Sequence, residues 1–166
     1  MENNNKINAI VEEILQEVKN YGDIAVKKYT KKFDGFNPDP MQVSKEELED
    51  AWNEIDSNLK RSLEVAHKRI NKFHEKEIPL SFTIKGKHGD TVQRRWKPVK
   101  RAGIYIPGGR AAYPSTVLMN AIPATVAGVE EIIMVSPGNN VGKINKTVLA
   151  AAHLSGINKV FRIGGA

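Results

Sequence analysis

Residues 101–129 constrain the fold more than any other part of the chain. They open with a short run of β-branched and aromatic residues, 102–106, which the glycine-proline turn 107–109 ends. A run this short, closed by turn residues, predicts a buried strand rather than a helix. The longer apolar segment 115–127 predicts a helix directly after the turn.

Two prolines mark this expected helix. Pro114 sits where the helix begins, with a backbone angle that already suits its first turn, whereas Pro123 inside the segment predicts a kink or a split into two helices. A strand, a glycine turn and a helix in succession present backbone N–H groups to an anion or a nucleotide. The turn reads PGGR, without the spacing of the dinucleotide fingerprint or the P-loop. The residues alone therefore leave open a tight turn and a ligand-binding turn.

The second half of the chain alternates between strands and helices. After the first strand and helix come an apolar strand at 131–135, a short helix at 147–154 that Gly156 caps, and a strand at 159–163. This β-α-β-α-β order predicts parallel strands joined by right-handed crossovers. The last strand runs into Gly164, Gly165 and Ala166, where a further crossover helix is expected. We therefore expect a truncated unit with an open apolar sheet face; the alternative is that a partner chain covers this face.

The first half of the chain predicts helices. Residues 5–19 carry one apolar stripe, 23–33 form a second helix with a lysine-rich outer face, Ser44 and Glu47 form a capping box, and 57–77 form a long helix. The apolar stripe of the first helix consists of Ile7, Ile10, Val11, Ile14, Leu15 and Val18, and one face of the second helix carries Ala25, Tyr29 and Phe33. The positions expected to be buried are Leu48, Ala51, Trp52 and Ile55 after the capping box, and Leu59, Leu63, Ala66, Ile70 and Phe73 in the last helix.

Residues 80–99 predict a β-hairpin that turns at 86–90, with Val92 and Trp96 as candidates for its buried face. Much of the net charge of +6 is in and near this hairpin, where seven cations face only Asp90: Lys85, Lys87, Arg94, Arg95, Lys97, Lys100 and Arg101. No nucleic-acid motif or aromatic platform accompanies the charge, so we interpret it as the exposed face of the hairpin and expect no nucleic-acid partner.

Composition places the chain among ordinary globular proteins. Its 166 residues are ample for one core, and 27% of them are charged. The chain has no cysteine, which excludes disulfides and thiolate metal sites within it. No apolar run approaches membrane-spanning length and the polar N-terminus lacks a signal-peptide core, so we expect no membrane association and a cytoplasmic protein.

The residues alone indicate no catalytic group. Four histidines, His67, His74, His88 and His153, are the side chains that titrate near neutral pH, and no pair has the spacing of a helical metal site. The chain contains no nucleophile elbow and no recognisable Ser-His-Asp set.

Several stretches resemble one enzyme family. The sequence GIYIPGGRAAYPSTVLMNAIPATVAGVEEI is similar to the signature region of histidinol dehydrogenases, and the similarity extends through YGDIAVKKYTKKFDGF, INKFHE, WKPVKRAGIYIPGG and VLAAAHLSGINKVFRIGGA. Together these stretches cover nearly the whole chain. The resemblance implies an enzyme that uses zinc and NAD to oxidise L-histidinol, through L-histidinal, to L-histidine in histidine biosynthesis. It also implies a homodimer.

The resemblance assigns part of an NAD site to this chain. The family tyrosine that contacts NAD matches Tyr105, and Pro107, Gly108 and Gly109 match the adjoining turn, where missing side chains let a cofactor approach the backbone. The zinc ligands, the acid-base residues and most substrate contacts of the family match no position of this chain, so the resemblance implies that this chain alone is inactive. The alternative for Tyr105 is a strand residue that only packs against the core.

The expected fold class is therefore α/β: N-terminal helices and a β-hairpin, followed by an incomplete Rossmann-like parallel unit. The resemblance implies that residues 1–100 belong to a first incomplete Rossmann-like domain and residues 101–166 to the first half of a second, NAD-binding one. Two other functions stay open from the sequence. One is a stand-alone, non-catalytic module that binds a nucleotide or a partner chain through residues 105–110; the other is a related dehydrogenase that acts on a different alcohol.

Overall fold

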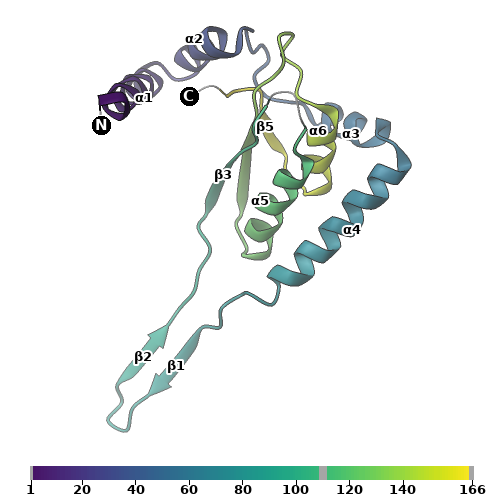
Figure 1. The fold of residues 1–166 in the computed structure, drawn as a ribbon. Coiled ribbons are helices and arrows are strands. Elements are labelled where there is room, and N and C mark those ends of the chain that lie inside the picture. Colours follow the sequence, from purple (N-terminus) through teal and green to yellow (C-terminus); the bar gives the residue numbers. More distant parts are fainter. Residues whose placement is uncertain (1, 109–111, 165–166) are drawn as a thin grey trace.

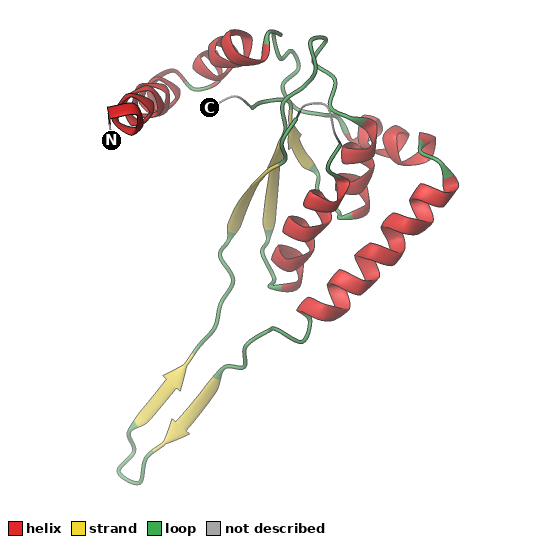
Figure 2. Cartoon of the chain, viewed as in Figure 1, coloured by secondary structure: helices red, strands yellow, loops and turns green. Residues whose placement is uncertain are grey.

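The computed structural model describes residues 2–108 and 112–164 (Figures 1 and 2). Four helices come first, a hairpin follows, and a parallel α/β unit completes the chain. The elements are α1 (Glu2–Tyr21), α2 (Asp23–Asp34), α3 (Lys45–Glu54), α4 (Ser57–His74), β1 (Phe82–Lys85), β2 (Thr91–Arg94), β3 (Arg101–Tyr105), α5 (Pro114–Val126), β4 (Glu131–Val135), α6 (Lys146–Leu154) and β5 (Lys159–Phe161). The expected α/β class is confirmed.

The parallel sheet has the strand order β3-β4-β5, so each strand lies beside the next one in the sequence. Successive side chains of a strand point to opposite faces. Along β3 and just beyond it, Ile104 and Ile106 are buried while Tyr105 between them is 54% exposed. Met134 in β4 and Val160 in β5 continue the buried face. This face of the sheet therefore carries the core.

Helices α5 and α6 cover the buried face, and α3 and α4 form a second helical layer outside them (Figure 1). The three alanines Ala150–Ala152 of α6 are fully buried, which lets this helix pack tightly between the sheet and α3. Trp52 of α3 is half-buried and stacks on the ring of His153, with 6.1 Å between the ring centroids. The core thus lies between one face of the sheet and two layers of helices.

No helix within residues 2–108 and 112–164 runs along the opposite face of the sheet, which agrees with the open apolar face expected from the sequence. Ile133, Val135 and Phe161 lie on this face and are only partly buried. In Figure 1, helices α1 and α2 lie near the carboxyl ends of the strands rather than across this face. Among the described residues, this apolar surface is therefore flanked by helices only at the carboxyl ends of the strands (Figure 1).

A segment that the sequence did not predict to pair closes the outer edge of β5. Gln42 forms an antiparallel bridge with Phe161, and the N–H of Val43 donates to the carbonyl of Val160 at 2.9 Å. The N–H of Arg162 donates to the carbonyl of Met41 at 2.8 Å. Because these hydrogen bonds satisfy the edge of β5, the loop between α2 and α3 is fixed to the parallel sheet.

The apolar stripe of the first helix is largely exposed. Helix α1 is present, but Ile7, Ile10 and Leu15 are each at least half exposed, and of the stripe only Ile14 is buried. The helix packs on α2 alone among the major contacts. Amphipathic spacing predicts a helix that has an apolar face, but what covers that face depends on segments distant in the sequence.

Two aromatic residues at helix ends are exposed, and for Phe73 this contradicts the predicted burial. Phe33 near the end of α2 is 43% exposed, and Phe73 near the end of α4 is 62% exposed. Helix α4 ends at His74 rather than near Glu77, so Phe73 lies in the last turn, away from the core that Leu63 reaches.

The hairpin β1–β2 has the expected turn but not the expected burial. The N–H of Gly86 donates to the carbonyl of Asp90 at 2.8 Å, and Ile84 pairs with Val92. Val92 is nevertheless 63% exposed and Trp96 47% exposed, because the hairpin projects away from the body of the chain (Figure 1). The prediction that these two side chains are buried is therefore wrong for the described residues.

At two helices, the predictions made from local sequence signals were only partly right. The hydroxyl of Ser44 accepts the N–H of Glu47 at 3.2 Å, as a capping box predicts, but the Glu47 carboxylate pairs with Arg162 instead of returning to the cap. Helix α5 continues through Pro123 and is not split. Its neighbours α4 and α6 hold it in place, so the loss of one backbone donor does not end the helix.

A row of charges joins the three parallel strands on the open face. The Glu131 carboxylate accepts from both Lys159 and Arg101, one on each neighbouring strand. The hydrogen bond from Lys159, followed by that from Arg101, lowers the pKa of Glu131 below its ordinary value. Ionised Glu131 thus holds the beginnings of β3, β4 and β5 together.

We predict that Glu131→Gln lowers the urea midpoint of unfolding at neutral pH and not in acid. A carboxyl whose pKa is lowered on folding stabilises the fold above the pKa it has when unfolded, and this stabilisation disappears as the pH falls through the lower, folded value. Parent and variant should therefore differ at pH 7 and converge below about pH 4. Glu130→Gln is the control, because Glu130 makes no ion pair among the described residues. A difference that persists undiminished at pH 3 contradicts this role.

Candidate functional site

The turns that follow the three parallel strands meet at Pro137. A Cβ atom on Gly108, after β3, would lie 2.5 Å from Cγ of Pro137, and one on Gly164, after β5, would lie 2.6 Å from its Cβ. Neither glycine has room for a side chain. The ring of Pro137 is therefore held between two glycine backbones, and this contact fixes the carboxyl edge of the sheet, where open α/β folds bind their ligands.

The loop after β4 is closed by its own hydrogen bonds. The side-chain oxygen of Asn139 accepts the N–H groups of Val141 and Lys143, at 3.1 and 2.9 Å. A Cβ atom on Gly138 would lie 2.7 Å from the backbone of Gly142, which itself has a left-handed φ of 75° that favours glycine. This loop leads into α6 and holds its polar side chains at the carboxyl edge.

Tyr105 faces a cavity on the open side of the sheet. Its volume is about 540 Å³, and helices α1 and α2 form the wall opposite the strand ends. The lining is mostly apolar and consists of Ile14, Val18, Val26, Tyr29, Thr30, Tyr105, Val135, Ile163 and Gly164. With its ring half exposed, Tyr105 is available to pack against a ring-shaped ligand there.

Pro107 and Gly108 line a different cavity. This second cavity, of about 450 Å³, lies between the turns after β3 and β4 and the start of α6, and it is the more polar of the two. Its polar side chains are Ser136, Asn139, Asn140, Lys143 and Asn145. The structure thus places Tyr105 and Gly108, three residues apart, on two different cavities. Gly109, the fourth predicted cofactor contact, lies outside the described residues.

The structure also supplies a reason for Gly108 that the sequence does not contain. Sequence reasoning assigned the glycine turn to close approach of a cofactor. In the structure, the contact with Pro137 alone already requires the missing side chain at Gly108. The two roles are compatible, because one side of the Gly108 backbone can contact Pro137 while the other side remains open to a cofactor.

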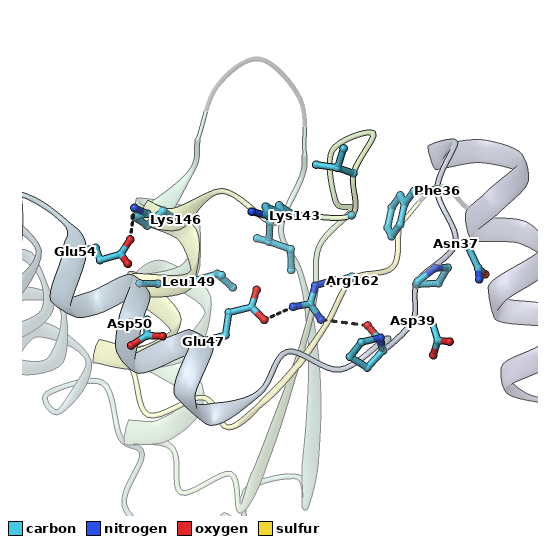
Figure 3. A pocket seen from close by; sticks show the side chains of 16 residues that line it. Phe36, Asn37, Asp39, Glu47, Asp50, Glu54, Lys143, Lys146, Leu149 and Arg162 are labelled. Carbon is cyan, nitrogen blue, oxygen red and sulfur yellow. Dashed lines mark hydrogen bonds and ion pairs between the residues drawn. The ribbon is translucent and has the colours of Figure 1, made fainter.

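A third cavity, of about 490 Å³, lies between the loop before α3, helix α3 and the start of α6 (Figure 3). Arg162 crosses it and is largely buried: its guanidinium donates to the carbonyls of Pro40 and Gln42, at 3.2 and 2.9 Å, and pairs with Glu47. Sequence reasoning missed Arg162. A charged residue within the apolar run VFRIGG was the available signal, but its partners lie some 120 positions earlier in the chain.

Asp34 joins the end of α2 to the end of β5. Burial raises the pKa of the Asp34 carboxyl, and a hydrogen bond from the backbone of Gly164 opposes that rise. Its second carboxylate oxygen is buried without a partner among the described residues. Asp34 therefore places a partly buried carboxyl near Gly164, beside the Tyr105 cavity, at a cost in desolvation.

The histidines do not converge. His74 contacts Glu77 at 2.5 Å between Nδ1 and Oε2, and His153 packs on Trp52. Within residues 2–108 and 112–164, no three His, Asp or Glu side chains lie close enough together to hold a metal ion.

No helix within residues 2–108 and 112–164 has the length and apolar character needed to cross a membrane.

Comparison with known proteins identifies the family. The family model described as histidinol dehydrogenase matches residues 1–166. The chain belongs to the histidinol dehydrogenase family. The histidinol dehydrogenase of Prochlorococcus marinus strain MIT 9312 is 88% identical over 165 residues, which are 99% of this chain and 38% of that protein. That of Aquifex aeolicus strain VF5 is 51% identical over 158 residues, 94% of this chain and 36% of that protein.

A solved structure agrees with this assignment. The crystal structure of histidinol dehydrogenase from Elizabethkingia anophelis superimposes with a TM-score of 0.90 at 35% identity, covering 96% of this chain and 37% of that one. The resemblance noted from the PGG turn and its flanking segments is thereby confirmed. The chain spans between a third and two fifths of the length of these relatives.

We predict that Gly108→Ala destabilises the fold by about 1–3 kcal/mol, because the new methyl group overlaps the Pro137 ring. Gly103→Ala is the matched control: Gly103 lies within β3, five residues before Gly108, and a Cβ atom there meets nothing within 4 Å. Its effect should stay within about 0.5 kcal/mol. Urea unfolding measures both variants, and the coupling between Gly108 and Pro137 follows from Gly108→Ala, Pro137→Ala and the double variant. Equal midpoints for Gly108→Ala and Gly103→Ala would show that the Gly108–Pro137 contact does not matter.

Proposed function

We propose that this chain forms the N-terminal part of an NAD- and zinc-dependent histidinol dehydrogenase, and that it contributes to the NAD site through Tyr105, Pro107, Gly108 and Gly109. The observation that carries the proposal is the position of Tyr105. In a chain of this family, a half-exposed aromatic ring stands at the carboxyl end of β3 and lies beside a mostly apolar cavity of about 540 Å³. Such a surface suits one ring of a dinucleotide.

The turn residues fit the same ligand. Pro107 and Gly108 lie at the carboxyl end of β3 and line the polar cavity, where the sugar and phosphate groups of a dinucleotide find hydrogen-bonding partners. When bound, NAD accepts hydride from the substrate carbon. We assign Tyr105 packing and hydrogen bonding to the dinucleotide, and no proton transfer.

The remaining chemistry belongs to residues that these relatives have beyond the matched part. The described residues offer no three-ligand cluster for zinc. We therefore propose that the zinc ligands, the acid-base residues and most contacts to L-histidinol come from those portions. The same proposal includes a homodimer in the cytoplasm, acting in histidine biosynthesis, with neither nucleic acid nor membrane as a partner.

The test uses a chimera in which this chain replaces the matching part of the Prochlorococcus marinus MIT 9312 relative, to which it is 88% identical. Supplied with zinc, L-histidinol and NAD, the chimera should form NADH, and the polypeptide of residues 1–166 alone should form none. NADH formation by the short polypeptide would place the chemistry within this chain. It would overturn the proposal that the zinc ligands and the acid-base residues lie in other portions of the enzyme. A chimera that reduces NAD only with a different alcohol would favour a related dehydrogenase.

For Tyr105 we predict that Tyr105→Ala in the chimera weakens NAD binding about tenfold, the loss expected when an aromatic contact of about 1–1.5 kcal/mol is removed. Tyr105→Phe keeps the ring and should lose less. Tyr21→Ala is the control, since Tyr21 is 64% exposed and does not line the cavity. Isothermal titration with NAD measures all three. Unchanged affinity in Tyr105→Ala removes Tyr105 from the site.

A further inference from the structure

The two cavities at the carboxyl edge lie on either side of strand β3. Tyr105 lines the apolar cavity and Gly108 the polar one, and three residues of extended chain span at most about 10 Å. A dinucleotide has an aromatic ring at each end and a diphosphate in its middle. A ligand whose ring packs on Tyr105 can therefore continue over the turn 107–108 and bring its diphosphate into the polar cavity.

Lys143 is the cation in the lining of the polar cavity, within the described residues. The closed loop around Asn139 fixes its backbone, because Asn139 both accepts the N–H of Lys143 and donates its own N–H to the Lys143 carbonyl, each at 2.9 Å. No carboxylate lies within ion-pair distance of its ammonium group among the described residues. The charge is thus held at the carboxyl edge by a preformed loop without being neutralised there.

Neighbouring charges are engaged elsewhere. Lys143 also borders the cavity of Figure 3, where Lys146 pairs with Glu54, Arg162 pairs with Glu47, and Asp39 pairs with Lys27. Of the acidic side chains in that lining, only Asp50 makes no ion pair among the described residues. The acidic residues near Lys143 are therefore largely occupied by other cations, and its charge remains available to an anion.

We propose that Lys143 binds the diphosphate of the dinucleotide in the polar cavity, while Tyr105 contacts one of its rings on the other side of β3. This inference rests on the proposed NAD site and adds to it a residue that the family signature does not contain. The amide side chains of Asn140 and Asn145, in the same lining, are placed to hydrogen-bond the adjoining sugar hydroxyls.

The test measures NAD binding by titration calorimetry in the chimera, at low and at high salt. Lys143→Gln should raise the dissociation constant for NAD about tenfold at low salt, the cost of one charge-assisted hydrogen bond. Lys143→Arg should recover most of the affinity. Lys146→Gln, three residues away and already paired with Glu54, should stay within about twofold of the parent. The deficit of Lys143→Gln should shrink as salt screens the exposed charge.

The outcomes are distinguishable. Parent affinity in Lys143→Gln, with NAD still bound and Tyr105→Ala still weakened, overturns the role of Lys143 and leaves the NAD site standing. An equal loss of NAD affinity in Lys143→Gln and Lys146→Gln would show that only the overall positive charge matters, and it also overturns the role of Lys143. A parent chimera that does not bind NAD overturns the proposed function together with this inference.

Discussion

The contact between the Pro137 ring and two glycine backbones holds the carboxyl edge of the parallel sheet together. The carboxyl ends of paired parallel strands lie at one edge of the sheet, so the turns that follow them are neighbours and can pack on one another. Here Gly108 and Gly164 approach Pro137 from the neighbouring strands, at distances that leave no space for a Cβ atom. This packing brings the turn after β3, the loop after β4 and the end of β5 into one rigid edge.

The rest of the structure supports that edge from two sides. The helical layers behind the sheet bury its inner face, and Arg162 ties the segment before α3 to the end of β5. On the other side, α1 and α2 line the cavity opposite Tyr105, and the Asp34 carboxyl at the end of α2 lies near Gly164. The result is an edge with an apolar cavity on one side and a polar one on the other, a division that suits a ligand with rings at its ends and phosphates in its middle.

Local signals made the α/β class, the parallel unit and most element positions predictable. Alternating apolar residues, glycine and proline at turns, and the Ser44 cap each act over a few residues. What depends on distant segments was not predictable. The side chains of Val92 and Trp96 were expected on a buried face of the hairpin, yet they are exposed because the hairpin projects away from the body of the chain (Figure 1). The apolar stripe of α1 is likewise largely exposed, since α2 covers only part of it.

The same distinction applies to the site. Tyr105 and the PGG turn could be singled out because they form one continuous motif, and their role as NAD contacts stays a prediction, as does the division into domains at residue 100. Arg162, Asp34 and the loop carrying Lys143 could not be found in this way. Their importance comes from partners far along the chain, such as Gln42 for Arg162 and Gly164 for Asp34.

The most direct test of the account is a hydrogen-exchange footprint of NAD on the chimera. If the dinucleotide lies over the carboxyl edge, NAD should slow amide exchange in residues 104–108 and 136–145 and leave the projecting hairpin β1–β2 unchanged. Protection confined to the hairpin, or to the portion contributed by the relative, would contradict the placement of the NAD site on this chain.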